Sequence, residues 1–204
     1  MSRGRRLSGR DWSIRYALGR PSWDLGGPHP ELVASLAEDP MLGGEAGSRR
    51  ALVPGCGLGH DAEALAQAGW AVTAVDYAAG LEPLVSGRFG PLGCRFVAED
   101  ALTFEDDEPY DLLFDHTFFC AIHPEDRVAF GELARRLVRP GGRVCSIVFP
   151  AGKAIGEGGP PWGIATSDLA EVLAPEFREI EDRPVVLCGH PSWSERWAVF
   201  ARSL

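Results

Sequence analysis

Apolar and polar residues alternate in blocks along this chain, in a way that predicts strands and helices following one another. Between residues 50 and 76, the apolar run "RALVP" precedes a glycine-rich turn, a helical pattern "DAEALAQAG" and a second apolar run, "AVTAVD". The alternation continues with strands predicted at "CRFVAED", "YDLLFDHT" and "RVCSIVFP" and a long helix predicted over "PEDRVAFGELARRLVRPGG". Strands that are apolar along their whole length are typical of a parallel sheet covered by helices on both faces.

The two ends of the chain carry shorter patterns. Short amphipathic helices are predicted at "DWSIRYALG" and "PELVASLAED". After a helix at "TSDLAEVLAPEF", the strand-like runs "FREIEDRP" and "ERWAVFARS" predict an antiparallel hairpin at one edge of the sheet. The stretch between Asp76 and Arg95 is rich in Gly and Pro and leaves room for one brief crossover helix at most. The sequence thus predicts one doubly wound α/β domain over residues 11–204, after a flexible N-terminal tail at residues 1–10.

The composition narrows the classes of function. The formal net charge is −9, whereas a general nucleic-acid-binding protein presents a basic face. No run approaches the roughly 18 apolar residues of a membrane span, and the N-terminal arginines are not followed by the apolar segment of a signal peptide. The widely spaced cysteines form no CxxC pair, which favours reduced thiols over disulfides or a metal site. We therefore expect a cytoplasmic protein without a nucleic-acid, membrane or metal partner. Both a monomer and a homodimer stay open.

Three glycines mark a ligand-binding turn after the first strand. "PGCGLGHD" contains Gly55, Gly57 and Gly59, and the absence of a Cβ lets the backbone approach a ligand closely. Asp76 closes the next strand, where a carboxylate accepts hydrogen bonds from the hydroxyls of a ribose. Asp100 follows the third strand, where the adenine edge would lie. These features end three successive strands and predict a nucleoside-binding crevice rather than a turn without a ligand.

The spacing of the glycines distinguishes between cofactors. A dinucleotide site prefers GxGxxG, but the third glycine position holds His60 here. The GxGxG spacing is the usual one for S-adenosylmethionine, which has no pyrophosphate. A nicotinamide-dependent oxidoreductase is disfavoured further because the chain has no Tyr-x-x-x-Lys set for hydride transfer. A non-catalytic protein that keeps this fold as a scaffold is the least favoured alternative, because the cofactor positions are intact.

Five longer segments carry a resemblance to a known family. "PSWDLGGPHPELV", "LVPGCGLGHDAEALAQAGW", "YDLLFDHTFFCAIHPEDR", "LVRPGGRV" and "FPAGKAIGEGGPPW" follow one another as in the thiopurine methyltransferase-like family, and most resemble its thiol and halide methyltransferases. The resemblance implies a class I methyltransferase fold, S-adenosylmethionine as donor and S-adenosylhomocysteine as product. It also implies that the acceptor is a thiol, hydrosulfide or halide ion. Methylation of an oxygen or nitrogen on a small metabolite or heterocycle stays open as an alternative.

The resemblance also implies which residues form the site. In this family aromatic residues of the N-terminal helix and of the loop after it close over the cofactor as a lid. The cofactor-binding residues implied are Trp12, Tyr16, Trp23, Gly55, Gly57, Gly59, Asp76, Asp100, Ala101 and His116. The acceptor-binding residues implied are Tyr16, Trp23, Phe119 and Trp162.

His116, in "FDHTFFCAIHP", is the candidate catalytic residue. The family places a cofactor contact at this position, and an imidazole there would also help to deprotonate a thiol, whose ordinary pKa is about 8.5. For its neighbour Asp115, the alternative role is to hydrogen-bond the loop backbone. For His123, the alternative role is to start a helix. Trp70 is expected to be structural. The C-terminal segment "CGHPSWSERWAVFARSL" departs from the plant enzymes of the family, which leaves the acceptor open.

Overall fold

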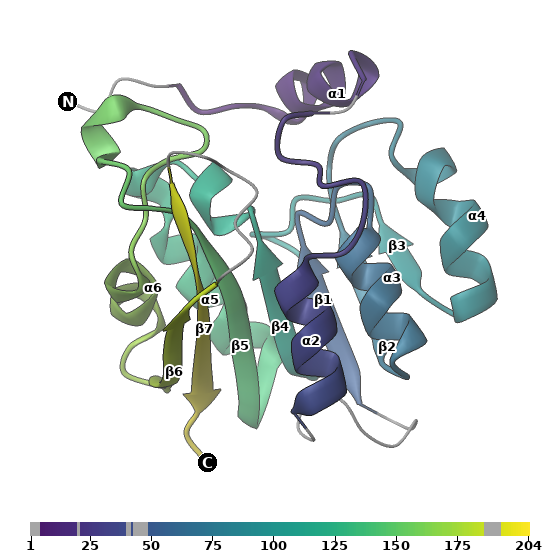
Figure 1. The fold of residues 1–204 in the computed structure, drawn as a ribbon. Helices are drawn as coiled ribbons and strands as arrows, with labels where there is room; N and C mark the ends of the chain where they lie inside the picture. Colours follow the sequence, from purple (N-terminus) through teal and green to yellow (C-terminus); the bar gives the residue numbers. More distant parts are fainter. Residues whose placement is uncertain (1–4, 20, 40–41, 43–48, 186–192) are drawn as a thin grey trace. The chain divides into compact units, whose positions relative to one another are not determined.

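The computed structural model of the chain describes residues 5–19, 21–39, 42, 49–185 and 193–204. Helices and strands alternate as the sequence predicts, and the strands form a seven-stranded, mostly parallel sheet (Figure 1). The chain divides into two compact units, one of residues 7–104 and one of residues 1–6 with 105–204. The predicted α/β fold is therefore confirmed.

The unit of residues 7–104 contains the first three strands. They are parallel, in the order β3-β2-β1, with Ala51 beside Val72 and Val75 beside Val97. Buried apolar side chains of β1 and β2 form its core. Its elements are α1 (Gly9–Ala17), α2 (Pro30–Glu38), β1 (Arg50–Pro54), α3 (His60–Gln67), β2 (Ala71–Val75), α4 (Glu82–Leu92) and β3 (Arg95–Val97).

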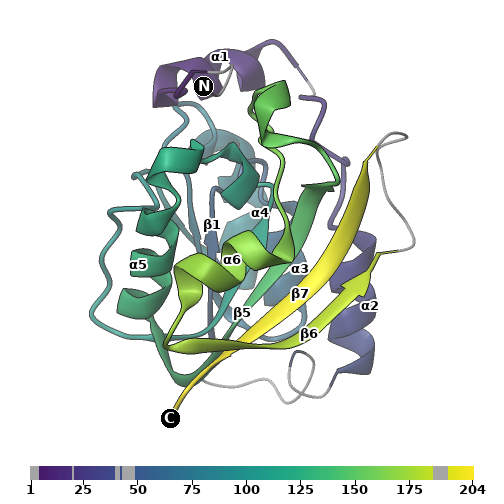
Figure 2. The same cartoon turned by 90° about the vertical axis from the view of Figure 1, so that its left-hand side faces the viewer.

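The unit of residues 105–204 contains the other four strands, in the order β4-β5-β7-β6. Strands β4 and β5 are parallel, while β7 pairs antiparallel with both β5 and β6, so the predicted C-terminal hairpin is confirmed. Figure 2 shows α6 in front of β5 and β7. The elements are β4 (Tyr110–His116), the 3-10 helices η1 (Phe119–Ala121), η2 (Pro124–Asp126) and η3 (Ile155–Glu157), α5 (Val128–Leu137), β5 (Val138–Ala151), α6 (Thr166–Leu173), β6 (Phe177–Pro184) and β7 (Ser194–Arg202).

Three predicted helices have different bounds in the structure. The long helix predicted over residues 124–142 is a 3-10 turn followed by α5, which ends at Leu137 because Pro140 has no backbone N–H and disfavours a helical residue before it. The helix predicted over residues 166–177 likewise ends at Leu173, two residues before Pro175. Between Asp76 and Arg95, α4 is 11 residues long rather than brief, and a left-handed Gly93 ends it.

Trp70 is structural, as predicted. It is buried, and its indole N–H donates to the Leu42 carbonyl at 2.8 Å. Cys56, Cys94, Cys120 and Cys145 are free thiols, while Cys188 lies outside the described residues. In the described part of the chain, no helix is long and apolar enough to cross a membrane. No group of three or more His, Cys, Asp and Glu in the same described ranges is arranged to hold a metal ion.

Candidate active site

The glycine turn between β1 and α3 has the left-handed backbone that glycine adopts readily. The φ angle is +60° at Gly55, +52° at Gly57 and +75° at Gly59. A Cβ at Gly57 would lie 2.5 Å from the Tyr16 hydroxyl, and one at Gly59 would lie 2.4 Å from the Phe89 ring. Glycine is therefore required by both the backbone and the space around it.

Replacing Gly59 by alanine is expected to lower the free energy of unfolding by roughly 2–4 kcal/mol, because a left-handed backbone and a clash with Phe89 add together. Gly80→Ala is the matched control: Gly80 has a φ of +91° and no atom within 4 Å of its Cβ. The control is expected to lose only the backbone contribution, roughly 1–2 kcal/mol. Urea denaturation measures both, and equal losses would contradict the close contact with Phe89.

Asp76 ties the glycine turn to the end of β2. Its Oδ2 accepts the Gly57 N–H at 2.9 Å and its Oδ1 accepts the Ala78 N–H at 2.9 Å. Burial raises the pKa of the Asp76 carboxyl above its ordinary value, although hydrogen bonds from backbone N–H groups oppose the shift. Each carboxylate oxygen has two lone pairs, so these bonds leave acceptor capacity for the hydroxyls of a ribose.

Trp12, Tyr16 and Trp23 form one aromatic cluster. The Trp23 ring lies edge-on to the other two, with centroids 5.4 Å from Trp12 and 5.9 Å from Tyr16. The Tyr16 hydroxyl lies beside Gly57. Burial, aided by the carboxylate of Asp76, raises the pKa of the Tyr16 phenol, so that it is a neutral hydrogen-bonding group at physiological pH. The structure thus brings the predicted lid residues to the glycine turn.

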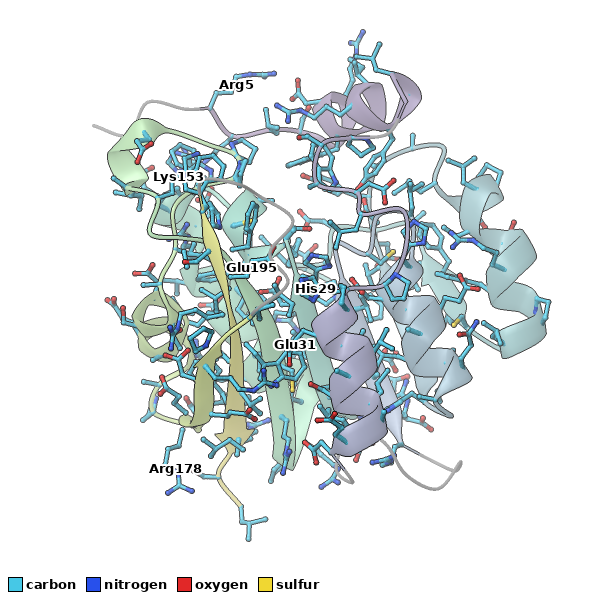
Figure 3. The ribbon with its side chains drawn as sticks, viewed as in Figure 1. Arg5, His29, Glu31, Lys153, Arg178 and Glu195 are labelled. Carbon is cyan, nitrogen blue, oxygen red and sulfur yellow. The ribbon has the colours of Figure 1, made fainter. Side chains whose placement is uncertain are left out.

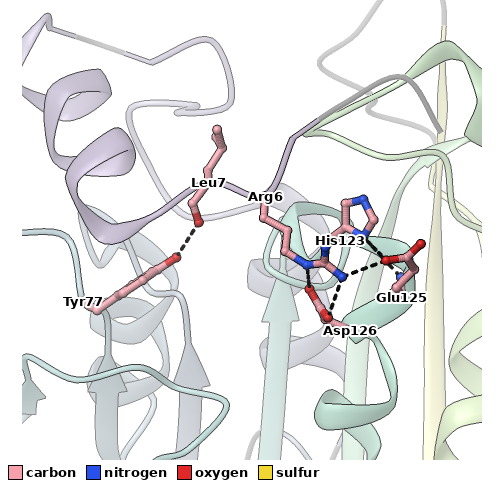
Figure 4. A network of polar contacts seen from close by, with 6 residues as sticks. All are labelled: Arg6, Leu7, Tyr77, His123, Glu125 and Asp126. Carbon is pink, nitrogen blue, oxygen red and sulfur yellow. Dashed lines mark hydrogen bonds and ion pairs between the residues drawn. The ribbon is translucent and has the colours of Figure 1, made fainter. Parts of the chain in front are cut away.

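Helix α1, which carries Trp12 and Tyr16, is anchored to the segment after Asp76. Ser8 and Asp11 cap its first turn reciprocally. The Ser13 hydroxyl accepts the Ala79 N–H at 2.7 Å, and the Tyr77 phenol donates to the Leu7 carbonyl at 3.4 Å (Figure 4). These contacts hold the aromatic cluster on the same structural unit as Asp76.

A charged network braces the glycine turn, and sequence reasoning missed it. Arg88 of α4 donates to the Leu58 carbonyl and, at 2.8 Å, to Glu63. Its Nη1 also lies 3.4 Å from the Nδ1 of His60, whose Nε2 is 3.3 Å from Asp24. The one signal of this network in the sequence was His60, which stands where a dinucleotide-binding turn has its third glycine. His60 thus contacts both the loop after Trp23 and the arginine that holds the turn.

Arg15 was also missed. Its guanidinium lies over the rings of Trp12 and Trp23, 5.3 and 5.8 Å from their centroids. The signal in the sequence was its place three residues after Trp12, since residues so spaced are neighbours on a helix surface. Arginine therefore occupies part of the ring surface of the aromatic cluster.

Asp100 and Ala101 lie in the turn after β3. The exposed Asp100 carboxylate accepts the Leu102 N–H at 3.0 Å, and Ala101 is buried. The predicted cofactor-binding residues thus lie in the unit of residues 7–104, with the exception of His116.

In the other unit, Asp115 organises the end of β4. Its Oδ2 accepts the Ser146 hydroxyl at 2.5 Å, and its Oδ1 accepts the N–H groups of Phe118 and Phe119 at 3.1 and 3.0 Å. The side chain is 1% exposed, and this burial raises the pKa of its carboxyl. Asp115 therefore hydrogen-bonds the loop backbone, the structural role that the sequence left open.

The turn that Asp115 holds is strained. Thr117 has a φ of +65°, and no other non-glycine residue in the described ranges has a positive φ. This conformation is unfavourable for a β-branched residue, and such strain gathers at functional sites. Half-buried His116 immediately precedes it. Asp115 thus fixes the backbone on which the candidate catalytic residue stands.

Phe119 and Trp162, the predicted acceptor contacts of this unit, are 0% and 1% exposed. Phe119 packs edge-on against Phe130 at 5.1 Å, and Trp162 packs edge-on against His123 at 4.9 Å. The backbone N–H of Trp162 also donates to the Cys120 carbonyl at 2.8 Å. Both side chains hold loops together, and their contact with an acceptor stays a prediction. His123 starts the 3-10 turn η2, as predicted.

Arg6, in the predicted N-terminal tail, belongs to this second unit. It makes two contacts with the Asp126 carboxylate, at 2.6 and 3.2 Å, and one with Glu125 at 2.8 Å (Figure 4). The guanidinium lowers the pKa of Asp126 below its ordinary value. These side chains are exposed, so the pair adds little to stability.

Comparison with known proteins identifies the family. Residues 7–82 match the sequence model of thiopurine S-methyltransferase (TPMT), and residues 51–142 match that of a methyltransferase domain. The chain is 35% identical over 168 residues to the probable thiol methyltransferase 2 of Arabidopsis thaliana, covering 80% of this chain and 71% of the relative. It is 34% identical over 180 residues to thiocyanate methyltransferase 1 of Brassica oleracea, covering 85% and 76%. The chain belongs to the thiopurine S-methyltransferase family.

Solved structures agree on the fold of this family member. The 1,6-didemethyltoxoflavin-N1-methyltransferase of Burkholderia thailandensis has a TM-score of 0.73 at 22% identity, covering 95% of this chain and 86% of that one. The N-methyltransferase NodS of Bradyrhizobium japonicum has a TM-score of 0.66 at 16% identity, covering 85% and 96%. The methyltransferase is thus a class I enzyme whose methyl donor is S-adenosylmethionine, as predicted. The left-handed backbone of the glycine turn and the spare acceptor capacity of Asp76 fit this donor.

Proposed function

We propose that this enzyme methylates the sulfur of a small thiol. The observation that carries the proposal is the 35% identity to a probable thiol methyltransferase over 80% of the chain. When bound, S-adenosylmethionine supplies an activated methyl group, which passes to the thiolate sulfur while the electron pair of the broken carbon–sulfur bond stays on the donor's sulfur. The work left to the protein is to hold the reactants, align them and exclude water.

Residues of the glycine-turn unit are proposed to bind the donor. Asp76 accepts the ribose hydroxyls, and the backbone of the turn at Gly55, Gly57 and Gly59 approaches the donor. The rings of Trp12, Tyr16 and Trp23 offer electron-rich faces, which attract a positively charged sulfur. Asp100 and Ala101 are proposed to lie beside the adenine.

His116 is proposed to orient the methionine part of the donor and to accept the proton of the thiol. Because an ordinary thiol has a pKa of about 8.5, only a small fraction is thiolate at neutral pH. A halide ion or hydrosulfide, the two alternative acceptors that the family resemblance implies, would need little or no base. We also propose that residues 11–204 act as one methyltransferase domain, in the cytoplasm, as a monomer or homodimer and without a nucleic-acid partner.

A panel of acceptors tests this function. A thiol, iodide and a phenol are each supplied with labelled S-adenosylmethionine under matched conditions, and the methylated products are measured. The thiol is expected to react fastest. A faster reaction with the phenol would favour the alternative of an oxygen-methylating enzyme and contradict the proposal.

Trp162→Phe is expected to raise the KM for the thiol roughly fivefold, the size of a lost aromatic contact, and to leave the affinity for S-adenosylhomocysteine unchanged. Trp197→Phe is the matched control, because Trp197 is also 1% exposed and packs against Phe114 within β7's unit. Steady-state kinetics and calorimetry measure the two constants. If the affinity for S-adenosylhomocysteine falls in Trp162→Phe, or if both variants raise the KM equally, the acceptor role of Trp162 is wrong.

A further inference from the structure

The chain contains a single lysine, Lys153; the other side chains in its total of 20 Lys and Arg are arginine. Lys153 lies two residues beyond the end of β5, in the loop that leads to α6 (Figure 3). Its ammonium is 4.9 Å from the centroid of the Trp193 ring and donates to the Pro161 carbonyl at 2.6 Å. Two segments distant in sequence thus meet at this one side chain.

Among the residues that the structure describes, Lys153 has no acidic partner, unlike most cations of its unit. Arg139 pairs with Asp111 at 2.5 Å, and Arg196 pairs with Asp182 at 2.6 Å. Within the described ranges of the chain, no carboxylate lies at ion-pair distance from the Lys153 ammonium. An ammonium has three N–H donors, and the bond to Pro161 uses one of them.

The register of the strands places Lys153 beyond the carboxyl ends of β4 and β5. Strands β4 and β5 are parallel, with His116 at the end of β4 beside Ile147, and β5 continues in the same direction to Ala151. Strand β7 runs antiparallel to β5 and begins there, with Ser194 beside Ala151. Lys153 and Trp193 therefore flank the end of the sheet that carries His116. Ligands of open α/β sheets bind at the carboxyl ends of the strands.

The surroundings of the ammonium are aromatic. The Trp193 ring packs edge-on against Phe149, with centroids 6.2 Å apart and planes at 67°. An indole face attracts a cation and fixes its position without neutralising its charge. A cation held over apolar rings suits a ligand that has a carbon chain and a negative charge, because the charge forms a strong hydrogen-bonded pair with the ammonium.

We propose that Lys153 is a specificity-determining residue, which favours thiol acceptors that also carry a carboxylate. The carboxylate binds the ammonium, and the rings of Trp193 and Phe149 cover the carbon chain. Lys153 takes no part in the bond changes of methyl transfer. The inference rests on the proposed function, and it narrows the acceptor to small mercapto acids.

Kinetics with two thiols of matched length test the proposal. The wild-type enzyme is expected to use 3-mercaptopropionate with a higher kcat/KM than 3-mercaptopropanol. Lys153→Met is expected to lower kcat/KM for the acid by about 10- to 100-fold and to change that for the alcohol by less than about twofold. Lys153→Arg, which keeps the charge, should restore much of the preference. Equal losses with both thiols, or an unchanged ratio, overturn the proposal.

A binding measurement decides the proposal without turnover. Reductive methylation with 13C-formaldehyde labels the single lysine and the N-terminal amine, and Lys153→Arg assigns the lysine signal. In the presence of S-adenosylhomocysteine, 3-mercaptopropionate is expected to shift this signal saturably, and 3-mercaptopropanol is not. No shift with the acid overturns the proposal and leaves methyl transfer standing. A saturable shift without methylation of any thiol would instead contradict the proposed function while supporting the Lys153 site.

Discussion

Replacing Asp76 by alanine is expected to weaken the binding of S-adenosylhomocysteine by about 1–3 kcal/mol, or roughly 5- to 150-fold in Kd. The variant loses the proposed acceptor of the ribose hydroxyls and also frees the Gly57 N–H that Asp76 accepts at 2.9 Å. Calorimetry measures the affinity. Glu38→Ala is the matched control, since it removes an equal charge from an exposed position of the same unit. Unchanged affinity in Asp76→Ala would show that the donor binds elsewhere.

The same carboxyl sets the direction of a pH dependence. Burial raises the pKa of Asp76, so it takes up a proton at a higher pH than an exposed aspartate does. Because the ionised form accepts more hydrogen bonds, the affinity for S-adenosylhomocysteine is expected to fall as the pH drops through this raised pKa. The Asp76→Asn variant is expected to bind S-adenosylhomocysteine more weakly than the wild type. Its affinity should also lack the fall that protonation of Asp76 causes.

Replacing Asp115 by alanine is expected to lower the free energy of unfolding by about 3 kcal/mol and to reduce kcat severalfold or more. The variant leaves the buried Ser146 hydroxyl and the N–H groups of Phe118 and Phe119 without their acceptor. It also releases the strained turn at Thr117, which follows His116. Urea denaturation and steady-state kinetics measure the two effects.

Ser146→Ala separates the two parts of this prediction. It removes one hydrogen bond to Asp115 and leaves both backbone contacts in place, so it is expected to cost about 1 kcal/mol and to retain most of kcat. Comparable losses of stability and kcat in the two variants would contradict the role of Asp115 in shaping the turn.

The sequence predicted the strands and the glycine turn because their signals are local. A run such as "AVTAVD" needs burial wherever it lies, and three glycines at a strand end need a left-handed backbone in this fold. The position of Asp76 followed from its place at the end of the second strand. The ends of α5 and α6 were missed because the prolines beyond them were given less weight than the helical pattern.

Contacts between distant residues had no such signal. Arg88 lies 30 residues from the carbonyl that it holds at Leu58, and Arg6 lies 120 residues from Asp126. Charged side chains on a surface show no period that identifies their partners, so only the tertiary structure pairs them. Loop aromatics are ambiguous for a related reason: Trp162 has the same sequence signal whether its ring lies in the protein interior or contacts a ligand.

The fate of one labelled methyl group shows which atom of the acceptor the enzyme methylates. The enzyme is incubated with S-adenosylmethionine carrying a 13C-methyl group and with 3-mercaptopropanol, which offers a sulfur and an oxygen on the same carbon chain. We expect a labelled methyl thioether, formed in equal amount with S-adenosylhomocysteine. Label on the oxygen, or bound S-adenosylhomocysteine with no labelled thioether from this or any other thiol, would contradict this expectation.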